Sequence, residues 1–286
     1  MENIVEIKGL CKNYNGFALD HVTFNVPKGA IVGLVGENGA GKSTSIKAVL
    51  GLIHADGGEI SLFGQDISRI DRQQKEMIGV VLDNCGFHDT LNFRDINNIM
   101  KKMYTQWDEA AFESYRQRFK LPEKKKVKEY SKGMKQKLAI AAALSHNARL
   151  LIMDEATSGL DPIVRDEILD ILLEFIQDEE HAVLISSHII SDLEKVADYI
   201  TFLHQGRVAF SENKDVLVYD YGVVKCTEED YRAMEKKHVL AVRRNAYACE
   251  VLINNREEFM RKNRKLTVDT TTIEEIILFQ VRGERV

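Results

Sequence analysis

The sequence predicts an α/β fold built around a mainly parallel β-sheet, and three observations lead to this prediction. Apolar segments of strand length alternate with helical segments along much of the chain. A glycine-rich loop joins one such strand, residues 31–35, to a helix that opens at Lys42. Another strand, residues 150–153, precedes a helix with Asp161 as its N-cap and Pro162 as its first residue. This alternation favours a sheet covered by helices on both faces.

The elements before residue 210 fall into three groups. The first 83 residues contain strand candidates at residues 4–7, 22–26, 31–35, 59–63 and 78–82, and we expect an antiparallel β part at the N-terminus. Residues 87–147 are predicted to form a mostly helical subdomain. A further apolar strand at residues 182–185 is followed by a short helix that ends near Ala197. We therefore expect one large domain over residues 1–210.

The pattern changes after about Ser211. Thr227 followed by Asp230 is typical of a helix start, and residues 238–242 and 247–253 are two strand candidates. Thr271 and Glu274 resemble a capping box, which would open a final amphipathic helix. We interpret residues 211–286 as a small accessory α/β domain.

Composition and charge narrow the class of protein. Of the 286 residues, 44% are hydrophobic and 29% are charged, which is typical of a globular protein. The net charge of −5 argues against sequence-independent binding of nucleic acid. No apolar run reaches the roughly 18 residues of a membrane span, and residues 1–4 lack the features of a signal peptide. The four cysteines form no C-x-x-C pair, so we expect reduced thiols.

Residues 36–43 match the phosphate-loop pattern G-x-x-x-x-G-K-[ST]. Glycines let the backbone N–H groups face one anion at the start of the following helix. Lys42 is expected to reach the β- and γ-phosphates of ATP, and the Ser43 hydroxyl to ligate Mg²⁺. The residues predicted to bind the nucleotide here are Gly36, Asn38, Gly39, Ala40, Gly41, Lys42, Ser43 and Thr44.

Two carboxylates, Asp154 and Glu155, stand at the end of the apolar strand 150–153. Ligands of a parallel sheet bind outside the carboxyl ends of its strands, where the phosphate loop is also expected. Asp154 is suited to holding Mg²⁺ through a hard oxygen, and Glu155 to orienting or deprotonating the attacking water. An acidic turn without function is the alternative for this pair taken alone.

Four further motifs resemble those of ABC ATPases. Residues 130–138, Tyr-Ser-Lys-Gly-Met-Lys-Gln-Lys-Leu, are similar to the signature motif of that family. Residues 158–161 resemble its D-loop, residues 185–188 its switch histidine, and Tyr14 its adenine-stacking aromatic. With the phosphate loop and the acidic strand, the resemblance covers residues 1 to about 210 in the family's order.

The resemblance implies roles for these positions. His188 would act in catalysis with Glu155, and Tyr14 would stack on adenine. Ser131, Lys132, Gly133 and Asp161 would face the ATP of a second ATPase subunit, because the family forms head-to-tail dimers with ATP in the interface. Three positions depart from the family pattern, and one of them is Met134, where the family usually has glutamine. Asp83 replaces a glutamine and either ligates Mg²⁺ or caps a turn, while Lys132 replaces a glycine and adds positive charge near the γ-phosphate.

The function implied is that of an ATP-hydrolysing subunit at the cytoplasmic face of the cell membrane. It would energise export of drugs, peptides or lipid-like substrates through a separate polytopic membrane subunit, for which residues 87–94 are a candidate contact. Two rival functions are an ABC ATPase acting on nucleic acid or ribosomes, and a nucleotide switch without turnover. The single phosphate loop and the net charge disfavour the first rival, and the presence of both Glu155 and His188 disfavours the second.

Overall fold

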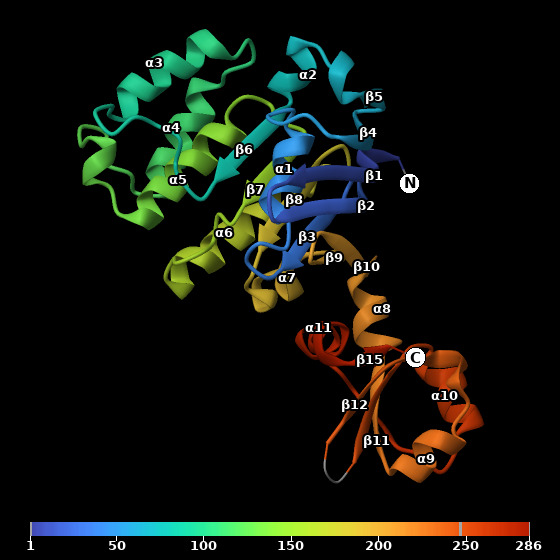
Figure 1. Ribbon diagram of the computed structural model, residues 1–286. Helices are drawn as coiled ribbons and strands as arrows, with labels where there is room; N and C mark the ends of the chain where they lie inside the picture. Colours follow the sequence, from blue (N-terminus) through green and yellow to red (C-terminus); the bar gives the residue numbers. More distant parts are fainter. Residues whose placement is uncertain (1, 246–247, 286) are drawn as a thin grey trace. The chain divides into compact units, whose positions relative to one another are not determined.

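The computed structural model describes residues 2–245 and 248–285, and it divides into two compact units (Figure 1). The first unit comprises Met1–Ala197 with Leu203–Val208, and the second comprises Asp198–Phe202 with Ala209–Val286. None of the helices in the part of the chain that the structure describes is long and apolar enough to cross a bilayer.

The first unit contains a small antiparallel sheet near the N-terminus. Its strand order is β2-β1-β4-β5, in which β1 runs from Asn3 to Tyr14 and pairs with β2 and β4 on its two sides. The bounds of the other strands are β2 Phe17–Pro27, β4 Gly57–Leu62 and β5 Gln65–Asp66. The predicted antiparallel β part is therefore present.

The larger sheet has the order β10-β9-β3-β8-β7-β6, and its pairs β3/β8, β8/β7 and β7/β6 are parallel. Its strands are β3 Ile31–Gly36, β6 Ile78–Leu82, β7 Leu150–Asp154, β8 Ala182–Ser187, β9 Tyr199–His204 and β10 Arg207–Asn213. All residues of β3 and β8 are buried, as expected for central strands with both faces covered. The predicted α/β fold with a mainly parallel sheet is confirmed.

The register of the parallel strands brings their carboxyl ends to one edge. Leu82 at the end of β6 lies opposite Asp154, Asp154 lies opposite Ser186, and Val35 in β3 lies opposite Ser187. Polar residues that follow these strands therefore meet at the same place. The α-helices that accompany the two sheets in the described part of the chain are α1 Lys42–Val49, α2 Arg72–Glu76, α3 Phe93–Met103, α4 Glu109–Arg118, α5 Lys132–Leu144, α6 Pro162–Phe175 and α7 Ile190–Val196.

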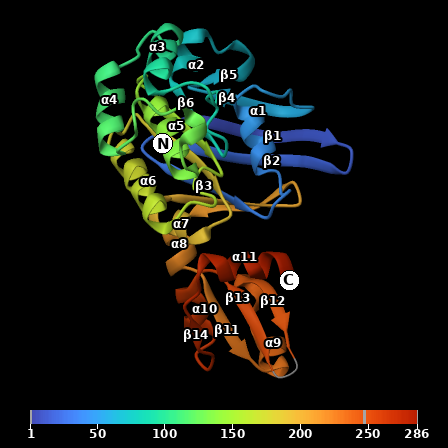
Figure 2. The same cartoon turned by 90° about the vertical axis from the view of Figure 1, so that its left-hand side faces the viewer.

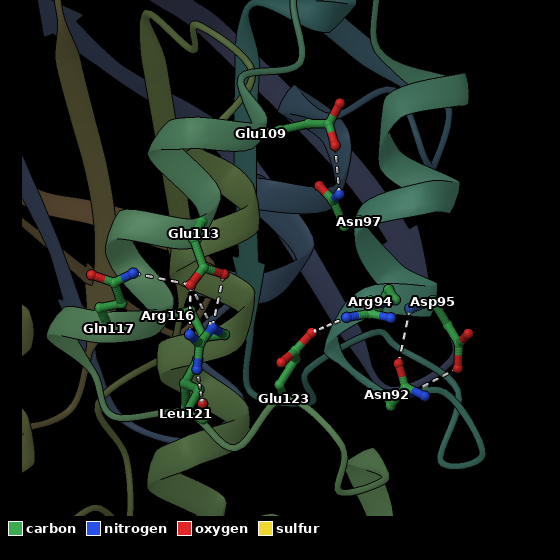
Figure 3. Close-up of polar contacts among 10 residues, drawn as sticks. All are labelled: Asn92, Arg94, Asp95, Asn97, Glu109, Glu113, Arg116, Gln117, Leu121 and Glu123. Atoms are coloured by element: carbon green, nitrogen blue, oxygen red, sulfur yellow. Dashed lines mark hydrogen bonds and ion pairs between the residues drawn. The ribbon is translucent and has the colours of Figure 1, made fainter.

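Helices α3, α4 and α5 form the predicted helical part and lie next to one another in sequence order (Figures 1 and 2). The rings of Phe93 and Phe112 stack between α3 and α4 with centroids 4.1 Å apart. Polar contacts reinforce this packing, including those from Asn97 to Glu109 at 2.9 Å and from Arg94 to Glu123 at 2.7 Å (Figure 3). This part of the chain leads into the signature motif at the start of α5.

The second unit contains an antiparallel sheet of order β14-β11-β13-β12-β15. Helices α9 and α10 lie on one side of this sheet and α11 lies on the other (Figure 1). Alternate residues of its strands pack against α9 and α10, as the two-residue period of a strand requires. Its elements are α8 Lys214–Tyr219, β11 Gly222–Cys226, α9 Glu228–Ala233, β12 Val239–Arg244, β13 Cys249–Ile253, α10 Arg256–Lys262, β14 Val268–Asp269, α11 Ile273–Arg282 and β15 Glu284–Arg285.

The start of the final helix differs from the sequence prediction. Thr272, rather than Thr271, is the N-cap of α11, and its hydroxyl accepts a hydrogen bond from the Glu275 N–H. The predicted capping box of Thr271 with Glu274 is therefore wrong by one residue. Thr271 is itself buried, and starting the helix at Ile273 turns its apolar face to the sheet.

Two other predictions concern a strand of the C-terminal unit and the cysteines. The predicted strand at residues 247–253 is found as β13 from Cys249 onwards, while Tyr247 lies outside the described residues. All four cysteines are free. Cys226 and Cys249 nevertheless stand opposite each other on β11 and β13, a proximity that their spacing in the sequence does not reveal.

Candidate active site

The phosphate loop connects β3 to α1, and its glycines are required by the backbone. Gly39 and Gly41 have φ angles of 84° and 112°, in the left-handed region that favours glycine. A Cβ atom on Gly36 would lie 2.4 Å from the carbonyl oxygen of Leu203, and one on Gly41 would lie 2.4 Å from the Leu19 side chain. The loop thus packs tightly and directs the start of α1 outward, where N–H groups are available to an anion.

The side chain of Lys42 is buried, and its amine has polar partners. Its Nζ donates to the carbonyl oxygen of Gly36 at 2.8 Å and lies 3.2 Å from Oε1 of Glu155. A buried ammonium group requires such partners, because desolvation without them is costly. The predicted phosphate-binding lysine and the predicted catalytic carboxylate are therefore in direct contact.

Asp154 is placed beside the phosphate loop by strand β7. The Ser43 hydroxyl donates to its Oδ1 at 3.1 Å, and the Ser186 hydroxyl donates to the same oxygen at 2.6 Å. Ser43 comes from α1, Asp154 from β7 and Ser186 from β8. The two residues predicted to hold a metal through the phosphate loop and the acidic strand, Ser43 and Asp154, are thus brought together.

Glu155 lies in the turn after β7 with a φ of 52°, an uncommon conformation for a residue other than glycine. Its N–H donates to the Ser186 hydroxyl at 3.0 Å. Its carboxylate is divided between two partners, since Oε1 faces Lys42 and Oε2 lies 2.6 Å from Nδ1 of His188. The arrangement places a carboxylate beside an imidazole at the edge of the phosphate loop. This geometry suits a general base that can pass a proton to a neighbouring group.

A cavity of about 460 Å³ opens over the phosphate loop. Tyr14, the predicted adenine-stacking residue, does not line it. Tyr14 is 48% exposed and pairs with Phe17 at the turn between β1 and β2, and Phe17 is the aromatic residue that lines the cavity. The lining residues are Gly16, Phe17, Glu37, Asn38, Gly39, Gly41, Lys42, Ser43, Thr44 and Glu155. Gly16, Phe17 and Glu37 were not predicted from the sequence, in which no signal distinguishes Phe17 from Tyr14 as the aromatic residue of the cavity.

The signature residues form a second group at the start of α5. Ser131 is the N-cap of α5, and its hydroxyl accepts from the Met134 N–H at 3.2 Å. Lys132 pairs with Asp83, with Nζ 2.9 Å from Oδ1. Both line a separate cavity of about 640 Å³. Asp83 therefore faces the signature motif, and its contact in this structure is Lys132 rather than the Ser43 and Asp154 pair.

The start of α6 lies beside this second group. Asp161 is the N-cap of α6 as predicted and accepts from the Val164 N–H at 3.1 Å. A Cβ atom on Gly133 would lie 3.3 Å from the Val164 side chain, so glycine allows close approach of α5 to α6. The chain thus carries two separate groups of predicted site residues, one around Lys42 and one around Ser131.

Comparisons with known proteins identify relatives of this chain. The family model for ABC transporters matches residues 19–158. The bacitracin transport ATP-binding protein BcrA of Bacillus licheniformis is 35% identical over 211 residues, which cover 73% of this chain and 69% of that protein. The lantibiotic transport ATP-binding protein SrtF of Streptococcus pyogenes is 35% identical over 74% of this chain and 92% of that protein.

The chain belongs to the ABC transporter ATP-binding protein family. As an ABC ATPase it binds and hydrolyses ATP, and the predicted family and activity are confirmed. Solved structures of the same fold include an ATP-binding subunit of an ABC transporter, with a TM-score of 0.68 and 29% identity over 75% of this chain and 91% of that one. A dimeric ATP-binding cassette with bound ADP and Pi matches with a TM-score of 0.65 and 21% identity over 73% of this chain and 98% of that one.

Proposed function

We propose that this ABC ATPase energises the export of a bacitracin- or lantibiotic-type compound through a separate membrane-spanning subunit. The observation that carries the proposal is the 35% identity to the BcrA and SrtF transport proteins over nearly three quarters of the chain. We place the chain at the cytoplasmic face of the membrane, with residues 87–94 as the contact for the membrane subunit. Phe87 and Asp89 of this segment line the cavity beside the signature motif, which supports that assignment.

The donor set beside the phosphate loop fits Mg²⁺. Ser43 and Asp154 offer a hydroxyl and a carboxylate 3.1 Å apart, and hard oxygen ligands of this kind suit that ion. The ion, when bound with ATP, neutralises charge on the β- and γ-phosphates. Asp83 is the third candidate ligand, and its side chain would have to leave Lys132 to take that role.

For hydrolysis, we assign Glu155 as the group that orients or deprotonates the attacking water and His188 as its partner. The 2.6 Å contact between Oε2 and Nδ1 supports this assignment. Lys42 would turn from Glu155 to the phosphates when ATP enters, which releases Oε1 of Glu155. The catalytic carboxylate thus becomes available when the phosphate site is filled.

We further propose that two copies associate head to tail. Ser131, Lys132, Gly133 and Asp161 of one copy would face ATP held by Lys42 of the other. The separation of the two groups of residues within one chain supports this proposal, because Lys132 lines a different cavity from the phosphate loop. The interface would be isologous, with each ATP shared by both copies.

A transport assay tests the proposal. The chain with Glu155→Gln would be purified from solubilised membranes with ATP, which should hold it in complex with its membrane subunit. The wild-type complex would then be placed in vesicles, and uptake of bacitracin or of a lantibiotic would be measured with ATP or ADP. ATP-dependent uptake by the wild type and none by the variant is expected. Full ATPase activity in a complex that moves neither compound would contradict the substrate assignment.

A further inference from the structure

Two of the three residues that depart from the family pattern contact each other. Asp83 follows strand β6 and Lys132 opens helix α5, and their side chains form an ion pair of 2.9 Å. The pair is about half exposed, with side-chain exposures of 53% for Asp83 and 48% for Lys132. Replacements at both ends of one contact indicate that the contact has a role of its own.

The same helix is attached to the end of β6 by a different kind of contact. The Gln136 side chain is buried and donates to the Leu82 carbonyl oxygen at 2.9 Å. Breaking this hydrogen bond would leave a buried polar group without a partner, so we expect it to persist. The exposed ion pair of Lys132 is individually weak by comparison and can be exchanged. Helix α5 therefore has a permanent attachment at Gln136 and a releasable one at Lys132.

Lys132 also lies against the loop that precedes α6. Gly159 in this loop has a φ of 67°, and a Cβ atom there would lie 3.3 Å from the Lys132 Nζ. The amine thus lies between the end of β6, the signature motif and the D-loop. Two of these three segments are expected to meet ATP of a second copy, and the third carries the candidate Mg²⁺ ligand Asp83.

We propose that the Asp83–Lys132 pair is an intrachain latch, which holds the Lys132 amine on Asp83 until ATP of a second copy competes for it. The inference rests on the head-to-tail dimer of the proposed function. When the dimer closes, Lys132 exchanges a carboxylate of its own chain for a phosphate of the ATP bound by the partner. The exchange frees Asp83 and makes dimer closure dependent on breaking a contact within each copy.

Dimer formation in the Glu155→Gln background measures this latch without relying on turnover. The readout is the ATP concentration that gives half-maximal dimer by light scattering after size-exclusion chromatography. Asp83→Asn removes the latch and keeps Lys132, so it should lower that concentration by about two- to fivefold, the scale of an exposed ion pair. Lys132→Gln removes the cation as well and should not lower it.

Two comparisons separate the latch from other effects. Asp89→Asn is the matched control, because Asp89 pairs with Lys135 of the same helix at 3.2 Å, and it should leave the ATP concentration unchanged. Asp83→Asn should have no further effect once Lys132→Gln is present. An Asp83→Asn effect that persists in the Lys132→Gln background, or an equal effect of Asp89→Asn, would overturn the latch.

The Glu155→Gln chain without further substitutions, here called the parent, shows whether a negative result concerns the latch or the dimer itself. If the Glu155→Gln chain forms a dimer with ATP but Asp83→Asn does not shift it, the latch alone is wrong. If the parent remains monomeric at every ATP concentration, the proposed dimer is wrong and the latch is overturned with it.

The melting temperature tests the ion pair itself. A chain with the charges reversed, Asp83→Lys with Lys132→Asp, should have a melting temperature close to that of the parent, whereas either reversal alone should lower it.

Discussion

The carboxylate of Glu155 lies 2.6 Å from Nδ1 of His188, through the oxygen that does not face Lys42. Lys42 lies 3.2 Å from the other oxygen, so Glu155 connects the phosphate-binding lysine to the histidine. A phosphate group that enters the loop competes with Glu155 for the Lys42 amine. With the roles proposed above, occupation of the phosphate site and release of Glu155 would therefore be linked by one side chain.

Glu155→Gln is expected to stop hydrolysis and preserve ATP binding. An amide of nearly the same shape keeps the contacts of the turn but does not accept a proton, and loss of a positioned base costs about 10²- to 10⁴-fold in rate. Phosphate release and calorimetric titration with Mg-ATP measure the two effects. An ATPase rate within a factor of two of wild type would exclude Glu155 as the base.

Lys42→Ala should abolish tight ATP binding, because it removes the cation that faces the β- and γ-phosphates. The variant also leaves Oε1 of Glu155 without its ion-pair partner. Titration with Mg-ATP provides the test. Lys47→Ala, on the exposed face of the same helix, is the matched control and should bind as wild type does. An unchanged dissociation constant for Lys42→Ala would refute the phosphate-loop assignment.

The Mg²⁺ dependence of ATPase activity tests whether Asp83 is a metal ligand in the closed state. Asp83→Ala should raise the Mg²⁺ concentration for half-maximal activity, and Asp83→Asn should lie between it and wild type because one oxygen ligand remains. Asp89→Asn serves as a control for loss of a nearby charge. Identical Mg²⁺ curves for all the proteins would remove Asp83 from the metal site and leave only its contact with Lys132.

Removal of the residues after Asp220 tests the role of the C-terminal unit. This cut keeps β10 and α8 whole, whereas a cut before Glu212 would sever β10. The truncated chain should bind Mg-ATP with a dissociation constant close to that of the full chain, because the phosphate-loop cavity contains no residue beyond Glu155. Weaker dimer formation would support a dimer-stabilising role. A soluble truncated chain without ATP binding would show that the two units do not have separate roles.

Stability should fall at mildly acidic pH because of His146. The ring is buried, stacks on Tyr104 with centroids 4.0 Å apart, and contacts the Glu76 carbonyl oxygen at 2.9 Å. Burial lowers the pKa of His146 below its ordinary value of 6.5. The unfolded chain therefore binds a proton at His146 more readily than the folded chain does. The free energy of unfolding is at its full value above about pH 6.5 and decreases as the pH falls below it.

Melting temperatures between about pH 7.5 and 5.5 measure this loss. His146→Gln removes the titrating group and should flatten the pH dependence, even though the variant melts lower at every pH. His88→Gln, at an exposed histidine, should keep the wild-type slope. If His146→Gln and wild type show the same slope, His146 is not the source of the acid sensitivity.

The conformation of the phosphate loop was predictable because it depends on short-range spacing. Gly39, Gly41 and Lys42 depend on local backbone conformation and on the strand and helix that flank them. These features are all encoded by one short, contiguous segment of the sequence. The N-cap at Asp161 was predictable for the same reason, since a cap satisfies N–H groups only two or three residues away. The cap at Thr272 was misplaced because adjacent threonines offer equivalent hydroxyls, and in the structure the Thr271 hydroxyl donates to the Glu275 carboxylate instead.

Contacts between distant segments were decided by the tertiary structure. The α/β fold, the phosphate loop, the acidic pair and the signature motif could be predicted from residue spacing and residue type. The sequence contained no signal that Asp83 would meet Lys132 or that Phe17 would line the cavity in place of Tyr14. Strand order and the packing of α5 against β6 bring such side chains together across long stretches of chain, and neither spacing nor residue type records which pairs will meet.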